Sequence, residues 1–229
     1  MTRVGLVGGL GPESTIDYYR RILERWATLA PDTSPEIVVD SLDVGRALAL
    51  VASDRAALIE YLSASIERLA SASADFVAMT ANTPHIVYDE LAARSRVPLL
   101  SIVETCAAEA QRRGLRHLLL LGTRFTMEAP FYPEVFARSG MSVVAPAEED
   151  RAWIHARYVG ELLSGDFRDE TRRELLARVE RLRDTVPLDG VILGGTELPL
   201  LLGASTVADL PALDTTALHV DAIVARLHA

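Results

Sequence analysis

Four short segments of the chain carry side chains that could bind or transform a small acid, and each follows an apolar run. They are Gly8–Thr15, Thr80–His85, Leu121–Thr126 and Gly194–Pro199. Glycine lets backbone amides approach a ligand, while threonine and asparagine side chains donate hydrogen bonds to carboxylates. These residue types therefore predict binding of a small anion at loops that join strands to helices.

The first segment reads Gly-Gly-Leu-Gly-Pro-Glu-Ser-Thr, and it ends a predicted strand and opens a predicted helix. Pro12 suits a first helical turn, and helix N-termini attract anions, so Gly9 is a candidate ligand contact and Glu13 a candidate base. A dinucleotide site is disfavoured because Ser14 stands where the fingerprint needs Gly or Ala, and the Gly-Lys-Ser/Thr of a P-loop is absent. The alternative interpretation is a tight structural turn without a ligand.

The second segment places Asn82 and Thr83 at the start of a predicted helix, where both can donate hydrogen bonds to a carboxylate. The alternative is that they only cap this helix. His85 is a candidate proton carrier because the ordinary pKa of histidine lies near neutrality. It is equally compatible with a packed or capping side chain on the first helical turn.

The remaining two segments add further donors and a second candidate base. Thr196 is a candidate anion donor, and Glu197 is either a base or the structural partner of an arginine. Thr123 and Thr126 are candidate carboxylate donors, and Arg124 between them is a candidate charge clamp.

Apolar runs alternate with longer amphipathic stretches, which is typical of a parallel sheet in an α/β fold. Strands are predicted at 4–8, 37–40, 76–80, 99–103, 118–122, 142–145, 191–194 and 211–214. Helices are predicted at 15–29, 55–71, 85–94, 104–114, 131–139, 151–163, 170–185 and 216–227. In open parallel sheets, ligands bind beyond the carboxyl ends of the strands, which is where the four segments fall.

The chain also repeats itself at a nearly constant spacing. Gly8 and Gly122 end similar strands 114 positions apart, and Asn82 and Thr196 follow equivalent strands at the same spacing. The repeat predicts two pseudo-symmetric, three-layer α/β domains with the active site in the cleft between them. The expected first domain comprises residues 1–98 plus 206–229, and the expected second domain comprises residues 99–205.

Composition narrows the function classes. The net charge of −9 disfavours nucleic acid and anionic membranes as partners, and no apolar run approaches the roughly 20 residues that span a bilayer. No lysine is present, which excludes Schiff-base and pyridoxal phosphate chemistry on lysine, and the five histidines show no metal-ligand spacing. Cys106 is the single cysteine and is expected to be buried and inert. With no signal peptide evident, we expect a cytoplasmic protein that contains neither a metal nor a cofactor.

Taken together, the segments resemble the aspartate/glutamate racemase family of cofactor-independent enzymes. The resemblance covers essentially the whole chain. It rests on the segments at 8–15, 82–85, 121–127, 153–155 with 160–162, and 195–201. It implies the two-domain fold with its cleft, a small amino-acid-like carboxylate as ligand, no cofactor, and a homodimer.

The chain departs from this family at the two positions that the family uses for catalysis. The resemblance implies a cysteine before the Asn-Thr pair and another between glycine and Thr-Glu, but these positions hold Ala81 and Gly195. In the family, one thiolate removes the α-proton and the opposite thiol returns a proton, each being worth about 10²–10⁴-fold in rate. Ser164 stands where some relatives carry a lysine for the substrate's acid group, and Arg46 corresponds to the family's substrate-binding arginine.

Three hypotheses follow from this conflict. The first is an enzyme of the family that acts on an acidic C–H or similar bond without thiols, by isomerisation, epimerisation, elimination or decarboxylation. Its base would be His85, Glu197 or Glu13, in that order of preference. The alternative is a catalytically inactive carboxylate-binding or sensing homologue. Two-thiol racemisation is third, because it needs Cys106 to reach the site from a predicted helix.

Overall fold

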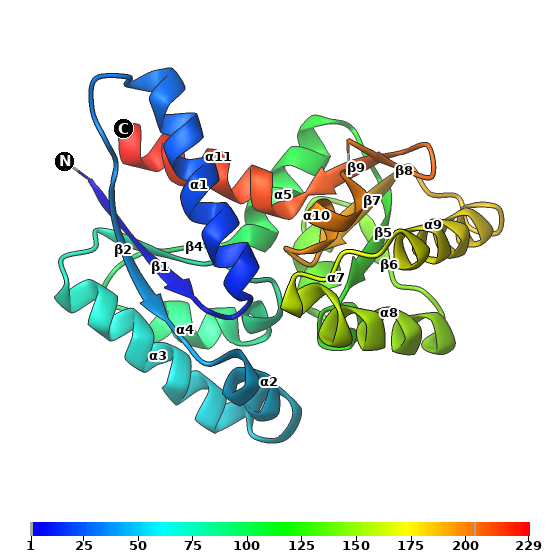
Figure 1. Cartoon of the computed structure of the whole chain (residues 1–229), viewed down its shortest axis with the longest axis horizontal. Coiled ribbons are helices and arrows are strands. Elements are labelled where there is room, and N and C mark those ends of the chain that lie inside the picture. Colours follow the sequence, from blue (N-terminus) through cyan, green and yellow to red (C-terminus); the bar gives the residue numbers. More distant parts are fainter. Residues whose placement is uncertain (1, 204) are drawn as a thin grey trace. The chain divides into compact units, whose positions relative to one another are not determined.

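The computed structural model describes residues 2–203 and 205–229, which divide into two compact units (Figure 1). Unit 1 contains the residues up to Ile102 together with His219–Ala229, and unit 2 contains Val103–Leu218. The expected boundaries were at 98/99 and 205/206. Residues 206–218 group with unit 2 because their strand at 210–214 pairs with a strand of that unit.

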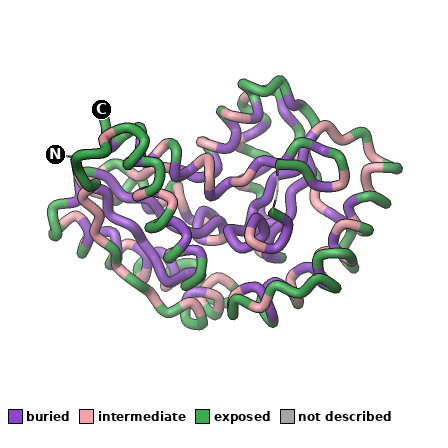
Figure 2. Tube along the Cα trace, turned by 45° about the horizontal axis from the view of Figure 1, so that its top comes forward, coloured by how far each residue is buried: buried purple, intermediate pink, exposed green. Residues whose placement is uncertain are grey.

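Unit 1 is built on a parallel sheet of four strands. These are β1 (Arg3–Gly8), β2 (Glu36–Ser41), β3 (Phe76–Met79) and β4 (Leu99–Leu100), and they lie in the order β2-β1-β3-β4. Val4 pairs with Phe76 and Gly5 with Val77, so β1 and β3 run in register at the centre. Strand β3 and all of β1 except Arg3 are buried, which explains why the two strands read as continuous apolar runs (Figure 2).

Helices cover both faces of the unit 1 sheet. The helices of this unit are α1 (Pro12–Leu29), α2 (Val44–Ser53), α3 (Arg55–Ser71), η1 (Thr83–Val87), α4 (Tyr88–Arg94) and α11 (Thr215–His228). One face packs Val4 and Leu6 against α1 and α11, and the other packs Val7 and Val77 against α2, α3 and α4. The alternation of Leu6 and Val7 follows from the two-residue period of a strand.

Unit 2 contains five strands in the order β6-β5-β7-β9-β8. They are β5 (His117–Gly122), β6 (Ser142–Val144), β7 (Gly190–Gly194), β8 (Thr206–Val207) and β9 (Leu210–Asp214). Its helices are α5 (Ile102–Arg112), α6 (Arg124–Glu128), α7 (Phe131–Ala137), α8 (Glu148–Gly160), η2 (Leu162–Ser164), α9 (Asp169–Arg183) and α10 (Leu198–Leu202). All of the strand pairs are parallel except that of β8 with β9.

The order β2-β1-β3-β4 of unit 1 recurs in unit 2 as β6-β5-β7-β9. Gly8 and Gly122 end the equivalent strands β1 and β5, while Asn82 and Thr196 follow the equivalent strands β3 and β7. The predicted α/β class with two parallel-sheet units is therefore confirmed. In the described part of the chain, no helix is long and apolar enough to cross a membrane.

Several elements differ from the prediction. Helices α2, α6 and α10 and strand β8 were not expected, and β4 is shorter than predicted because α5 already begins at Ile102. The start of the predicted helix at 85–94 is a 3₁₀ turn that begins at Thr83. Pro84 suits this first turn because its missing N–H has no helical partner there.

Candidate functional site

The glycine turn after β1 uses its own side chains to satisfy its backbone. The Gly9 amide donates to Thr15 Oγ1 at 2.9 Å, and Thr15 Oγ1 donates to the Gly11 carbonyl at 3.1 Å. Gly9 has a φ of +75°, and a Cβ atom there would lie 2.6 Å from the Leu42 nitrogen. These contacts support the interpretation of this segment as a tight structural turn. Glu13 lies exposed at the start of α1.

The end of β3 is tied to this turn. Ser14 Oγ donates to the Thr80 carbonyl at 2.9 Å, and the Thr80 hydroxyl donates to the Val7 carbonyl at 3.2 Å. Ala81 follows and is almost fully buried. The methyl group of Ala81 cannot exchange a proton, and the Thr80 hydroxyl is already engaged with the backbone.

His85 is locked in place by backbone hydrogen bonds. Its Nδ1 lies 3.1 Å from the Ala81 carbonyl oxygen, and its Nε2 accepts the Ile102 amide at 3.3 Å. These partners define a neutral ring with the proton on Nδ1. Burial lowers the pKa of His85 to about 4. The Ile102 amide thus occupies the lone pair of Nε2. The ring of His85 stacks on that of Tyr88, with 5.3 Å between the two ring centres.

The other candidate ligand contacts of unit 1 differ in how far they are buried. Asn82 is buried and Thr83 is half-buried at the start of η1, directly after β3. Arg46 is exposed on α2, where its guanidinium lies 4.5 Å from the centre of the Tyr61 ring on α3. This cation–π contact gives Arg46 a local structural partner.

In unit 2, two buried threonines begin helix α6 beside the end of β5. Thr123 is the N-cap, and its hydroxyl accepts the Thr126 amide at 3.2 Å and lies 3.2 Å from the Thr126 hydroxyl. The next amide, that of Arg124, donates to Nδ1 of His155 on α8 at 3.3 Å. Burial and the positive charge of Arg124 lower the pKa of His155, which favours the neutral ring that this bond requires.

The end of β7 carries a buried cluster of hydroxyl and carboxylate groups. The Tyr158 hydroxyl donates to Glu197 Oε2, and Thr196 Oγ1 donates to the same oxygen at 3.0 Å. The Glu197 amide approaches the Tyr158 oxygen at 3.4 Å. Burial, followed by the negative charge of Glu197, raises the pKa of Tyr158 well above its ordinary value. The tyrosine is therefore a neutral phenol that holds a proton against the carboxylate.

Gly195 has no side chain, and Tyr158 fills the space that a side chain would need. A Cβ atom on Gly195 would lie 2.6 Å from the Tyr158 oxygen and 2.8 Å from Cζ, distances that real Cβ atoms essentially never show. The phenol oxygen thus lies 2.6 Å from where the Cβ of a residue at 195 would lie. This is one of the two positions at which the resemblance implies a cysteine.

The sequence prediction missed His155 and Tyr158 as site residues, although they lie three residues apart on one face of α8. His155 reaches the loop after β5, and Tyr158 reaches the loop after β7. A helix presents residues i and i+3 on the same side, so a site role for His155 would have predicted that Tyr158 faces the same region. The contact of Tyr158 with residue 195, however, joins positions 37 apart and has no local signature.

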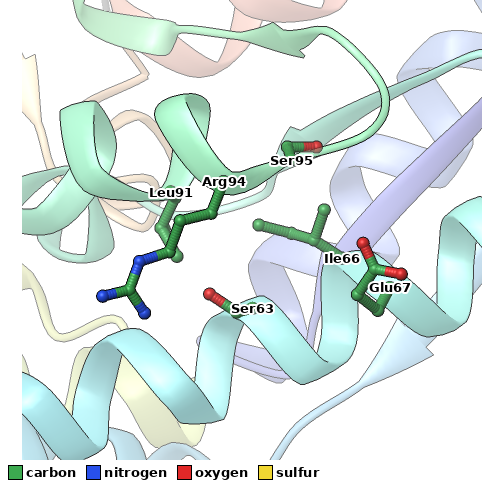
Figure 3. Close-up of a pocket in the computed structure, with 6 residues that line it drawn as sticks. All are labelled: Ser63, Ile66, Glu67, Leu91, Arg94 and Ser95. Carbon is green, nitrogen blue, oxygen red and sulfur yellow. The ribbon is translucent and has the colours of Figure 1, made fainter.

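Neither Cys106 nor the cavity between α3 and α4 enlarges the site. Burial raises the pKa of the Cys106 thiol, and the residue is fully buried, as predicted. A cavity of about 30 Å³ lies between α3 and α4 and is lined by Ser63, Ile66, Glu67, Leu91, Arg94 and Ser95 (Figure 3). It has room for one or two waters but not for an amino acid. Among the described residues, no group of three His, Cys, Asp or Glu could hold a metal ion.

The fold and these loops define a class of protein: two parallel α/β units with polar side chains at the carboxyl ends of equivalent strands. Residues 7–223 match the sequence profile of the family described as Asp/Glu/Hydantoin racemase. The chain therefore belongs to this racemase family, which confirms the resemblance.

Individual relatives agree with this assignment. Over 145 residues the chain is 25% identical to the broad specificity amino-acid racemase RacX of Bacillus subtilis (strain 168), covering 62% of this chain and 63% of that relative. A candidate Asp/Glu racemase from Yersinia pestis superposes with a TM-score of 0.88 at 31% identity, with full coverage of both chains. An aspartate racemase homologue from Pyrococcus horikoshii OT3 gives 0.83 at 29% identity, again with full coverage of both.

Proposed function

We propose that the chain is a cofactor-independent isomerase that acts on the acidic Cα–H bond of a small, amino-acid-like carboxylate without using a thiol. Family membership supports a racemase-like enzyme, and RacX, named for broad amino-acid specificity, supports an amino acid as substrate. Elimination or decarboxylation at the same carbon would need the same stabilised carbanion. We also propose that the chain forms a homodimer, as the family resemblance implies.

One observation carries the proposal, namely the buried carboxylate of Glu197 at the carboxyl end of β7. Only 1% of Glu197 is exposed, and its Oε2 accepts hydrogen bonds from two hydroxyl groups. Buried carboxylates in defined hydrogen-bond networks are typical of catalytic acids and bases. Ligands of open parallel sheets bind at this end of the strands.

The other two candidate bases are less suited to the role. The Nε2 lone pair of His85 already accepts the Ile102 amide, and the ring is neutral and buried. Glu13 is exposed at the first turn of α1, where water competes for its carboxylate. We therefore place Glu197 ahead of both residues as the base.

The developing negative charge of the substrate needs hydrogen-bond donors. Thr123 and Thr126 are buried at the end of β5, and Asn82 and Thr83 follow β3, whereas the Thr196 hydroxyl donates its proton to Glu197. Preorganised donors of this kind stabilise an enolate-like carboxylate in proportion to the charge that develops on it. Assigning these residues to the substrate is part of the proposal.

The test is proton NMR in D₂O with the purified protein and both enantiomers of aspartate, glutamate and a panel of neutral amino acids. Enzymatic loss of a Cα–H signal is expected, and Glu197→Gln should slow it by about 10²–10⁴-fold. Glu161→Gln is the matched control, because Glu161 is a second buried glutamate of unit 2 and is held by Thr171 and Arg157. Unchanged exchange in Glu197→Gln would exclude Glu197 as the base.

A second candidate function is a non-catalytic carboxylate-binding protein. It is favoured by one specific observation, the absence of an ionisable side chain at both Ala81 and Gly195. Saturable binding of one acid in the panel without exchange of any Cα–H bond would establish this function instead.

A further inference from the structure

Tyr158 and Gly195 form a complementary pair in unit 2. The tyrosine lies on α8 and is 2% exposed, and its ring lies against the backbone of Gly195, where a Cβ would overlap it. Any larger residue at 195 would push the ring away. The glycine thus makes room for a phenol oxygen at the carboxyl end of β7.

The hydrogen bonds of this phenol fix its orientation. Its proton points to Glu197 Oε2, and its oxygen faces the Glu197 amide at 3.4 Å. A phenol oxygen has two lone pairs, so it can accept a further proton while it donates its own. The Tyr158 hydroxyl can therefore pass a proton between a group beside residue 195 and the Glu197 carboxylate.

We propose that the Tyr158 hydroxyl is the catalytic group of unit 2 that exchanges a proton with the substrate carbon, and that Glu197 stores the proton behind it. The inference rests on the proposed isomerase function and names the atom that performs its central step. It requires no metal, oxidant or additional co-reactant.

The step balances as a two-proton relay. The Cα–H bond breaks and its proton goes to the Tyr158 oxygen, while the phenol proton moves to Glu197 Oε2. The C–H electron pair stays on the substrate as a carboxylate-stabilised enolate, so the product state contains a neutral phenol and a neutral Glu197. Reversal of both transfers returns a proton to the carbon, and deuterium enters when the protons on Tyr158 and Glu197 exchange with D₂O before the reversal.

This relay explains why a tyrosine can work beside a carboxylate. Burial, followed by the negative charge of Glu197, raises the pKa of Tyr158, because a phenolate here would be a second charge in a buried site. In the relay the phenol stays neutral before and after the step. The net base is the carboxylate, and the step does not require a phenolate.

The relay has a stereochemical consequence. The position in unit 1 that corresponds to Gly195 holds Ala81, which has no ionisable side chain. A single relay returns the proton to the face from which it was taken, so isomerisation also needs a proton delivered to the opposite face by another donor. Exchange of the Cα–H of one enantiomer with deuterium is therefore expected to run at least tenfold faster than inversion.

The experiment compares Cα–H exchange in D₂O and ligand binding in wild type, Tyr158→Phe, Glu197→Gln and the double variant. Tyr158→Phe should lose exchange by about 10²–10⁴-fold, and the double variant should be no slower than the slower single variant, because both residues act in one relay. Affinity for the substrate should change by less than about threefold. Tyr18→Phe is the matched control, since it deletes a buried tyrosine hydroxyl that bonds His219 in unit 1.

The outcomes separate this inference from the proposed function. Exchange that persists in Tyr158→Phe but is lost in Glu197→Gln would overturn the role of Tyr158 and leave the isomerase in place. A wild type that exchanges no acid of the panel would overturn both. If Tyr158→Phe fails to fold, a fluorinated tyrosine at 158 keeps the ring and makes the phenol more acidic. It should change the rate of exchange at a fixed pH, because the phenol takes part in both proton transfers, and an unchanged rate would overturn the inference.

Discussion

The substitution Gly195→Ala tests the packing on which the site depends. The added Cβ would lie 2.6 Å from the Tyr158 oxygen and 2.8 Å from Cζ. Either the ring moves and the phenol loses its hydrogen bond to Glu197, or the backbone after β7 moves. Overpacking a buried site costs about 1–3 kcal/mol. A lost hydrogen bond to a charged group costs about 1.5–3 kcal/mol. We expect the free energy of unfolding of unit 2 to fall by about 2–4 kcal/mol. The two costs do not add in full, because a ring that moves away loses its hydrogen bond but relieves the overpacking.

The sign of this effect should reverse when the ring is absent. Gly195 does not adopt a left-handed φ, so alanine is compatible with its backbone. In a Tyr158→Ala background, Gly195→Ala should therefore be neutral or stabilise unit 2 by up to about 1 kcal/mol. Gly160→Ala is the matched control, because Gly160 ends α8 and a Cβ there meets nothing within 4 Å.

The assay is urea unfolding followed by the fluorescence of Trp153, which lies on α8 together with Tyr158. The chain has two tryptophans, and Trp26 belongs to unit 1, so a Trp26→Phe background reports on unit 2 alone. An equal cost of Gly195→Ala with and without the Tyr158 ring would refute the packing argument. So would a Gly195→Ala variant as stable as its parent.

Two further predictions concern buried ionisable groups. Because burial lowers the pKa of His85 to about 4 from an ordinary 6.5, the unfolded chain binds its proton first as the pH falls. The stability that neutral His85 contributes is therefore complete above about pH 6.5 and is lost progressively towards pH 4. His85→Gln should flatten that part of the stability profile of unit 1, measured by Trp26 fluorescence in a Trp153→Phe background, and an unchanged slope would contradict it. In unit 2, Glu161 accepts bonds from Thr171 at 2.6 Å and Arg157 at 2.7 Å, which lower its pKa. Glu161→Gln should cost about 1–3 kcal/mol at pH 7 by urea unfolding, and this cost should shrink as the pH falls below the ordinary carboxyl range, because the unfolded chain binds the Glu161 proton first. A cost independent of pH would show that its charge is not what matters.

The sequence predicted the architecture because the relevant signals are local and repeated. Buried parallel strands leave continuous apolar runs, and Gly8 and Gly122 mark equivalent strand ends at one spacing. Helix α2 escaped notice, although Asp43 and Asp54 accept the amides of Arg46 and Ala57 as N-caps of α2 and α3. Those capping residues were readable signals.

The roles of individual site residues were less accessible because they depend on contacts between distant segments. His85 has the residue type of a proton carrier, but the amide of Ile102, 17 positions later, occupies its Nε2. Gly9 was predicted as a candidate ligand contact or as part of a structural turn, and its amide donates to Thr15 Oγ1. Residue type limits what a side chain can do, and its hydrogen-bond partners decide whether the relevant atom is available.

The pairing of Gly195 with Tyr158 also limits how this chain could adopt thiol chemistry in unit 2. A cysteine at 195 would carry a Cβ into the phenol ring and its sulfur beyond, so Gly195→Cys alone would displace Tyr158 and break its bond to Glu197. Gly195→Cys with Tyr158→Ala would give the thiol room but would remove the phenol. Thiol and phenol are thus mutually exclusive occupants of one space. Gly195 therefore does more than remove a thiol, because a residue without a Cβ leaves the space that the Tyr158 ring and hydroxyl occupy.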